Sequence, residues 1–380
     1  MSRNPKRFVS RARPEPRLRD TVWQDIREGD VPRALRRDFR DIQRFYLDDE
    51  RRHELARMRP LKRLFVRVFW LLKASLLKLS PARRLLVLAA LAFLVLGETR
   101  FQWGEFSFSS DLGPWSAVIL LFVLMLELKD KLLARDEIEI ARQVQLALLP
   151  HEAPRLDGWS IHLFTRPAND VGGDLVDAIR LAPDQLALIL GDVAGKGLGA
   201  ALLAAKLQAT LRALAPGHRS LDALGQQLNR IMTRDGLPNR FSTLFYLEIA
   251  AEGDEVRYLN AGHCPPFVVR GSRVDLLKPA SLPLGIDAEE HFAEGRLSLA
   301  PGEALVAYSD GVTEARNAAD EMFGERRIER ALERLRGRGV SEIGARLVRA
   351  VDDFVADERR DDDLSLVIVA RAPAGRPSSD

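Results

Sequence analysis

The chain has 380 residues, of which 46% are hydrophobic and 29% are charged. This length exceeds one typical domain, and the composition is that of a folded protein rather than a disordered one. Cys264 is the only cysteine, which excludes a disulfide framework and a cysteine-rich zinc site within one chain. Its neighbours in NAGHCPPF provide no activating base, so we do not expect nucleophilic cysteine chemistry.

The net charge of +3 hides an uneven distribution along the chain. Residues 1–84 hold 24 Lys and Arg against 11 Asp and Glu, whereas the remainder holds 33 against 43. Residues 1–60 are therefore predicted to form a basic, partly helical N-terminal segment that contacts an anionic partner. No aromatic stacking pattern or zinc spacing accompanies its arginines, so we expect them to lie on solvated helix faces or against lipid headgroups rather than on nucleic acid.

Residues 61–128 have the pattern of a membrane-associated region. Apolar residues recur at helical spacing over 61–79 with Lys and Arg between them, as in a helix that lies on a membrane surface. Two apolar runs follow, over about 85–97 and 112–128. Both are shorter than the roughly 20 residues of a comfortable spanning helix. We interpret them as a short transmembrane hairpin; a buried helical hairpin in a soluble domain is the alternative.

Lys and Arg flank both ends of this predicted hairpin, and the segment between the two runs is net acidic. The positive-inside rule then places both ends in the cytoplasm. The expected localisation is the cytoplasmic (inner) membrane, with the remainder of the chain facing the cytoplasm.

Residues 128–150 are predicted to form a connecting, regulatory helix. The segment has strong helix formers and no glycine, and Pro150 ends the pattern. Its apolar positions do not form a clean heptad. Two interpretations therefore stay open: a weakly dimerising helix that would allow a homodimer, and an amphipathic helix packed on the following domain.

Residues 151–370 are predicted to form one α+β domain. Strand-like runs recur there, and helical stretches interrupt them in blocks. Consecutive strands separated by turns indicate mainly antiparallel pairing, and grouped helices indicate separate helical layers. Residues 371–380 are expected to be a disordered tail.

Four short acidic segments in this domain carry most of the functional information. Each places a carboxylate beside glycines or at the edge of an apolar run, where a strand ends in a loop. Oxygen ligands of this kind suit Mg²⁺ and Mn²⁺, so the first hypothesis is a metal-dependent hydrolase. The segments are VGGD ending at Asp174, GDVAGKG around Asp192, SDGVTE around Asp310, and DDDLS beginning at Asp361.

The GDVAGKG segment does not fit a nucleotide-binding P-loop. That loop needs four residues between its first glycine and GK, followed by Ser or Thr, whereas three residues separate Gly191 from Gly195, and Gly197 follows Lys196. Instead, Asp192 ends the apolar run LALIL, and Asp310 ends ALVAYS in the same way. Two ions bridged by such carboxylates can activate a water molecule and orient it in line with a phosphoester.

These motifs occur in a fixed order together with TLFY, NAGHCPP, LPLGI and PGE-x-LV-x-YSDGVTEA-x-N. In that order they resemble the bacterial metal-dependent serine/threonine phosphatases of type 2C, in the SpoIIE-like branch, over about 138–370. The resemblance implies an αββα sandwich, with two mainly antiparallel sheets flanked by helices and two Mn²⁺ or Mg²⁺ ions between the sheets. It also implies that the carboxylates meet at these ions.

The resemblance further assigns roles at the metal site. Asp192 would bridge both ions, Val193 would offer its carbonyl, and Asp174 would lie at the metal site. Asp310 and Asp362 would be further ligands, and with Asp192 they are the expected catalytic residues. The three consecutive aspartates leave the register within 361–363 open by one residue.

The function implied is hydrolysis of phosphoserine or phosphothreonine on a regulatory protein, such as an anti-sigma-factor antagonist, in bacterial signalling. Control would pass through the membrane-linked helix. One alternative is a catalytically inactive phosphatase-like membrane adaptor, which the intact carboxylates oppose. Another is a phosphodiesterase or small-molecule phosphate hydrolase with the same metals. His263 stays open between a general acid and a structural hydrogen-bonding residue.

Overall fold

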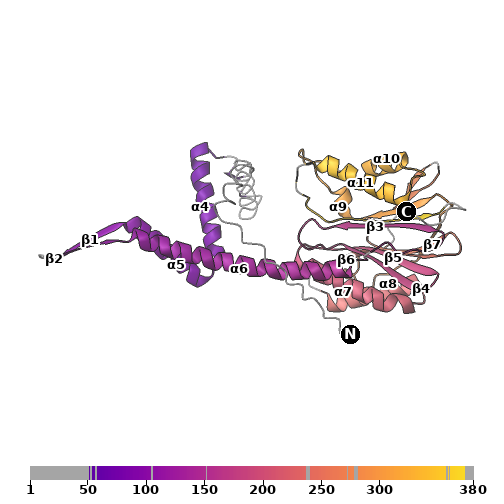
Figure 1. Ribbon diagram of the computed structural model, residues 1–380, viewed down its shortest axis with the longest axis horizontal. Helices are drawn as coiled ribbons and strands as arrows, with labels where there is room; N and C mark the ends of the chain where they lie inside the picture. The colour runs from indigo at the N-terminus through magenta and orange to yellow at the C-terminus, as the bar shows by residue number, and fades with distance from the viewer. Residues whose placement is uncertain are drawn as a thin grey trace, which may run out of the picture. The chain divides into compact units, whose positions relative to one another are not determined.

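The computed structural model describes residues 51–372, apart from 52–53, 56–57, 104–105, 151, 237–239, 272, 278–280, 357 and 359, and describes only the backbone over 98–110. The predicted N-terminal segment and tail therefore lie almost entirely outside the described residues. The chain divides into two compact units, Met1–Lys131 and Leu132–Asp380, and their elements are labelled in Figure 1.

The described part of the first unit is helical except for one two-stranded ribbon. Helices α4 (Pro60–Lys78) and α5 (Pro81–Leu96) each begin with a proline, whose fixed φ suits the first helical position. Strands β1 (Glu98–Trp103) and β2 (Phe106–Asp111) pair antiparallel and lead into α6 (Gly113–Leu148). The segment between the two predicted apolar runs is thus a β-ribbon, which the alternating FSFSS pattern of β2 favours.

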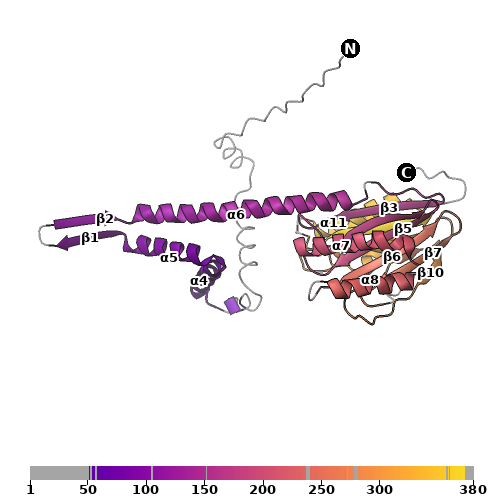
Figure 2. The ribbon, with the colours of Figure 1, turned by 90° about the horizontal axis from the view of Figure 1, so that it is seen from below.

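Both predicted apolar segments are helical, and α5 runs beside the first part of α6 (Figure 2). Arg83 of α5 forms ion pairs with Glu127 at 2.7 Å and Asp130 at 2.6 Å on α6. Large apolar side chains of both helices are exposed, among them Val95 at 85% and Trp115 at 62%.

By length and composition, the described stretch that could cross a membrane is Leu198–Gly217, with 44% of its apolar window buried. That stretch contains a helix that packs on a sheet of the second unit, so packing accounts for its apolar character. Helix α5 has 16 residues, fewer than the roughly 20 that span a bilayer comfortably. Membrane association of the first unit stays a prediction.

The second unit has two five-stranded antiparallel sheets, in the orders β10-β7-β6-β5-β4 and β3-β12-β11-β8-β9. The first sheet comprises β4 (Leu175–Ala182), β5 (Gln185–Val193), β6 (Ser242–Ala250), β7 (Glu255–Ala261) and β10 (Gly295–Ser298). The second comprises β3 (Trp159–Arg166), β8 (Phe267–Val269), β9 (Val274–Leu276), β11 (Ala304–Tyr308) and β12 (Leu364–Arg371).

Helices cover the outer face of each sheet, as Figure 1 shows. The first sheet carries α7 (Leu198–Leu214), the short η1 (Ala215–Gly217) and α8 (Leu221–Asp235). The second carries α10 (Glu325–Arg334) and α11 (Val340–Val355), and a single turn, α9 (Asp310–Thr313), follows β11.

Three apolar layers hold this unit together. In β5, Leu186, Leu188 and Leu190 pack between the sheets, whereas Ala187 and Ile189 pack against α7 and α8, because side chains alternate across a strand. A strand buried on both faces reads as a continuous apolar run, as LALIL does. The αββα layering predicted from the sequence is confirmed.

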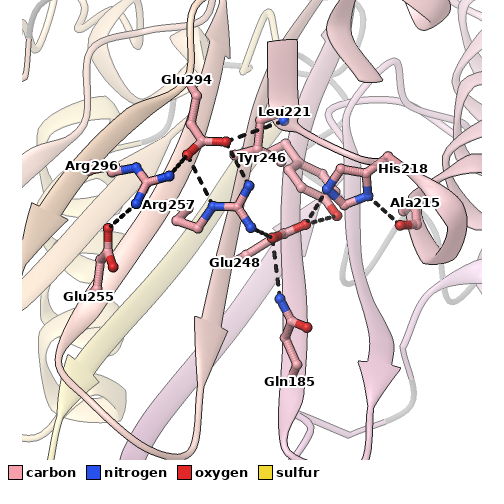
Figure 3. A network of polar contacts seen from close by, with 10 residues as sticks. All are labelled: Gln185, Ala215, His218, Leu221, Tyr246, Glu248, Glu255, Arg257, Glu294 and Arg296. Carbon is pink, nitrogen blue, oxygen red and sulfur yellow. Dashed lines mark hydrogen bonds and ion pairs between the residues drawn. The ribbon is translucent and has the colours of Figure 1, made fainter. Parts of the chain in front are cut away.

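A buried polar network joins the corner between α7 and α8 to the first sheet (Figure 3). Glu248 of β6 accepts hydrogen bonds from Tyr246 at 2.9 Å and Arg257 at 3.1 Å, and His218 Nε2 lies 3.0 Å from it. Arg257 also pairs with Glu294 at 2.6 Å. Each buried acid in this network therefore has at least one basic partner.

Candidate metal centre

The end of β5 supplies the first carboxylate of the site. Asp192 lies opposite Thr243 of β6, and the Ala194 amide donates to the Phe241 carbonyl at 2.9 Å, which holds the loop that follows. Burial, together with the charges of Asp310 and Asp362, raises the pKa of Asp192 to about 7. Acidic groups from distant parts of the chain therefore meet at this strand end.

Asp310 comes directly after β11 and begins the single turn α9. Burial raises its pKa to about 6, with the Asp362 charge as the next cause. A Cβ on the adjacent Gly311 would lie 1.9 Å from the Asp363 carbonyl oxygen. Only glycine therefore lets this turn approach the loop before β12 so closely.

Asp174 is the most buried of the predicted carboxylate ligands, with 7% of its surface exposed. Its Oδ2 is buried without a hydrogen-bond partner. Burial and the charges of Asp192 and Asp363 raise its pKa well above the ordinary value. A buried, unpartnered carboxylate oxygen costs free energy, and a cation is the partner that its charge favours.

The three consecutive aspartates have three different environments. Asp363 is buried and accepts hydrogen bonds from the amides of Ala168 at 2.7 Å and Gly173 at 2.6 Å, so it anchors the VGGD loop. Asp362 is half-buried and interacts electrostatically with Asp192 and Asp310, and the charge of Asp363 also acts on Asp192. Asp361 is exposed. Of the three, Asp363 positions the loop, and Asp362 stays the predicted ligand.

Two serines connect β11 to β12 beside these aspartates. The Ser309 hydroxyl donates to the Asp363 carbonyl at 3.1 Å and accepts from the Ser365 amide at 3.0 Å. Both residues are fully buried. They fix the distance between the strand that ends at Asp310 and the loop that contains Asp362.

The carboxylates fit a divalent metal by their chemistry. Among the described residues, no group of three or more His, Cys, Asp or Glu side chains is arranged so that it could hold a metal ion as it stands. The predicted ligands nevertheless repel one another, and the Asp174 oxygen lacks a partner. A hard cation would offset both penalties. The Val193 carbonyl lies beside the VGGD loop, since a Cβ on Gly173 would meet it at 3.0 Å.

Comparison with known proteins decides the family. Residues 182–372 match the family model described as Stage II sporulation protein E (SpoIIE). The chain belongs to the SpoIIE family.

Curated relatives of this SpoIIE-family chain cover about half of it. Protein IcfG of Synechocystis is 32% identical over 51% of the chain and 35% of its own length. Phosphoserine phosphatase RsbU of Bacillus subtilis is 28% identical over 48% of the chain and 55% of its own length. Phosphoserine phosphatase RsbP of the same organism is 27% identical, over 48% and 46% respectively. The chain thus spans about a third to about half of the length of these relatives.

Solved structures show the same fold. The SiaA-PP2C domain of Pseudomonas aeruginosa matches 64% of the chain and 98% of its own, with a TM-score of 0.55 and 19% identity. The PP2C phosphatase domain of SpoIIE from Bacillus subtilis, with a fragment of its regulatory domain, matches 57% and 64%, with a TM-score of 0.51 and 21% identity. The predicted PP2C fold is confirmed.

His263 has the surroundings of a structural residue. It is 2% exposed, and its Nδ1 lies 2.8 Å from the Thr243 hydroxyl. Burial lowers its pKa to about 4, so the ring is neutral at pH 7. These surroundings favour the hydrogen-bonding role over a general acid, because the ring supports Thr243 opposite Asp192 in β6.

Sequence reasoning assigned no role to Gln145 or Lys196 and named Asp363 only within the open register of 361–363, yet all three residues contact the site. Gln145, near the end of α6, donates to the Gly172 carbonyl at 2.8 Å and accepts from the Gly172 amide at 3.1 Å. Asp363 and Lys196 also touch the loops that carry the predicted ligands. A glutamine in an amphipathic helix gives no signal of such a contact, whereas the lysine in GDVAGKG was visible and had no assigned role.

Proposed function

We propose that the chain is a metal-dependent protein serine/threonine phosphatase that hydrolyses phosphoserine or phosphothreonine on a regulatory protein. The observation that carries this proposal is the meeting of Asp174, Asp192, Asp310 and Asp362 at the strand ends of a PP2C fold. The names of the relatives RsbU and RsbP, both phosphoserine phosphatases, support it.

The chain's own residues would hold two Mn²⁺ or Mg²⁺ ions. Asp192 is the proposed bridging ligand, and Asp174, Asp310, Asp362 and the Val193 carbonyl are the proposed further ligands. Bound there, the ions would lower the pKa of a water molecule and offset charge on the phosphoryl oxygens.

Other residues would keep these ligands in position. Asp363 holds the VGGD loop through backbone amides, and the hydrogen bond between His263 and Thr243 supports the strand opposite Asp192. Ligands held by such secondary contacts bind metal more tightly than free ones.

The surface beside the site supports a protein substrate over a small molecule. Leu198 is 40% exposed, Leu202 is 61% exposed and Phe241 is 38% exposed. The first two lie one turn apart at the start of α7, and the backbone of Phe241 pairs with the loop after Asp192. Exposed apolar side chains around a site are typical of protein contacts. We propose an anti-sigma-factor antagonist as the kind of substrate, by family resemblance.

The first unit would tether the enzyme to the cytoplasmic membrane, with the catalytic domain in the cytoplasm. The exposed apolar side chains of α4, α5 and the first part of α6 support this proposal, because large apolar surfaces need a lipid or protein partner. A reporter fused within 98–111 should be found outside the cytoplasm; a cytoplasmic reporter would exclude the hairpin topology.

Regulation would pass through α6. The Gln145 contact links this helix to the VGGD loop, and the Leu148 carbonyl accepts from Gln208 of α7 at 2.8 Å. A homodimer through 128–150 would change these contacts. Gln145→Leu should therefore change the Mn²⁺ concentration needed for half-maximal activity, whereas Gln143→Leu, at an exposed position of the same helix, should not.

The test of the main proposal is Mn²⁺-dependent release of phosphate from a phosphoserine protein. Asp192→Asn and Asp310→Asn should abolish release while the protein stays folded by circular dichroism. A wild-type protein without any hydrolase activity would favour the adaptor alternative. Hydrolysis of phosphodiesters or small phosphate esters, but not of phosphoproteins, would favour the other alternative.

A further inference from the structure

We propose that Lys196 binds the phosphoryl group of the substrate beside the carboxylate cluster, which is the set of predicted carboxylate ligands Asp174, Asp192, Asp310 and Asp362. This inference rests on the proposed phosphatase function and adds a residue for substrate binding to it. The metal assignment explains the aspartate and the glycines of GDVAGKG, but it leaves the lysine without a role.

Lys196 lies in the middle of the loop between β5 and α7, four residues after Asp192. Its ammonium donates to the Asp361 carbonyl and lies 3.1 Å from an Asp362 carboxylate oxygen. The positive charge of Lys196 also lowers the pKa of Asp310, against the larger effects that raise it. The ammonium therefore lies beside Asp362 and close enough to act on Asp310, on the side of the loop that faces the predicted ligands.

The loop is built to present this side chain. Gly195 and Gly197 have φ of +111° and +74°, a backbone conformation that other residues rarely adopt. Arg240 donates to the Ala194 carbonyl at 2.9 Å, and a Cβ on Gly195 would lie 2.1 Å from its guanidinium nitrogen. Arg240 thus covers one flank of the loop while Lys196 extends from the loop toward the carboxylates.

The ion pair between Lys196 and Asp362 contributes little to folding. The two side chains are 56% and 39% exposed, and exposed pairs of this kind are weak. An ammonium has three donors, and two of them face the Asp361 carbonyl and Asp362. Within the part of the chain that the structure describes, the third donor has no partner, so it can bind an anion from solvent.

A phosphomonoester is the anion that suits this position. Lysine binds phosphate as a point charge, and the proposed metal ligands lie on the same loop and its neighbour. A divalent ion held by Asp362 would weaken the attraction between that carboxylate and the Lys196 ammonium. The ammonium would then interact more strongly with the dianionic phosphoryl group. The expected role is to hold phosphoryl oxygens in both the bound substrate and the bound product.

The proposed contact between Lys196 and the phosphoryl group can be tested without turnover, by measuring the binding of inorganic phosphate to the full-length, Mn²⁺-loaded protein. By calorimetry, Lys196→Gln should weaken phosphate binding by about tenfold to a hundredfold, the usual range for a hydrogen bond to a charged group. Lys196→Arg should retain most of the affinity. Lys206→Gln is the matched control, because Lys206 is on α7 and its ammonium donates to the Asp235 carbonyl at the end of α8.

Two further measurements separate phosphate binding from a purely structural role. Lys196→Gln should leave the affinity for Mn²⁺ equal or tighter, and the urea midpoint unchanged. With a phosphoserine peptide, KM should rise by a similar factor, while the remaining kcat still depends on Mn²⁺.

Unchanged phosphate affinity in Lys196→Gln would overturn the inference, as would a parallel loss of Mn²⁺ affinity, which would place the lysine in support of the metal site. Phosphate binding that depends on Lys196 in a protein without phosphatase activity would uphold the anion site and refute the proposed function. Absence of phosphate binding to the Mn²⁺-loaded wild type would overturn the site itself.

Discussion

Two groups of acidic residues in the second unit have opposite charge balance: one lies around Glu248 on the first sheet, and the other lies around Asp192, where strand ends of both sheets meet. Around Glu248, each acid meets basic partners: Glu248 contacts His218 and Arg257, and Arg257 lowers the pKa of Glu294 to about 2 (Figure 3). Around Asp192, burial and neighbouring acids raise the pKa to about 7. A buried acid with partners stabilises the fold, whereas acids left to repel one another mark a site for an added cation.

The largest expected effect is a loss of phosphatase activity when a carboxylate of the group around Asp192 is replaced. Asp192→Asn should lower Mn²⁺-dependent phosphate release by about a thousandfold, because a bound metal contributes several kcal/mol to transition-state stabilisation. The same change removes a repelling charge, so urea unfolding in a metal chelator should show equal or greater stability. Asp184→Asn, at an exposed turn between β4 and β5, is the control. A clear loss of stability in Asp192→Asn would contradict the conclusion that the acids around Asp192 repel one another when no metal is bound.

The corresponding change in the other group should affect stability instead. Glu248→Gln should lower the free energy of unfolding by about 3 kcal/mol, since it removes the buried carboxylate that faces His218 and leaves Arg257 with Glu294 alone. The kcat of the folded enzyme should hardly change. The exposed rim pair of Glu255 with Arg296 supplies the control: Glu255→Gln should cost under about 1 kcal/mol. Equal urea midpoints for the two variants would show that the network is not structural.

The third effect in size is the stabilisation by Mn²⁺, which should depend on the group around Asp192 and not on the group around Glu248. Mn²⁺ at about 100 times its Kd should stabilise the wild type by about 2.7 kcal/mol, as for any ligand of the native state. The Glu248→Gln protein should keep this gain, and Asp310→Asn should lose most of it. Differential scanning fluorimetry with and without Mn²⁺ measures both. An undiminished gain in Asp310→Asn would remove Asp310 from the site.

The smallest expected effect is a pH dependence in the structural network. The hydrogen bond to Glu248 raises the pKa of His218 above its usual 6.5, so the protonated ring stabilises the fold. This contribution is fully present below about pH 6.5 and is lost as pH rises through the folded-state pKa. His218→Gln should therefore cost about 1 kcal/mol at pH 6 and less at pH 9. A constant difference in urea unfolding across this range would show that His218 is not charged.

The motifs located the carboxylates of the candidate site, but not the residues that hold them. Asp174, Asp192 and Asp310 stand at strand ends beside glycines, a local pattern that can be read directly. Gln145 contacts Gly172 across 27 residues, and no periodicity in α6 marks that position. The Glu248 network was missed for the same reason, because its members come from separate elements and none of them forms a motif.

By itself, the sequence determined the layering of the second unit, since strands buried on both faces need continuous apolar runs and grouped helices must cover the outer faces. It also predicted which carboxylates form the candidate site, through the ordered motifs that carry the family resemblance and place these residues at strand ends. Only the tertiary structure showed that Asp363 holds the VGGD loop, that Asp361 is exposed, and that Lys196 lies beside Asp362. Those roles depend on distances between segments far apart in the chain, which close packing sets and sequence spacing does not.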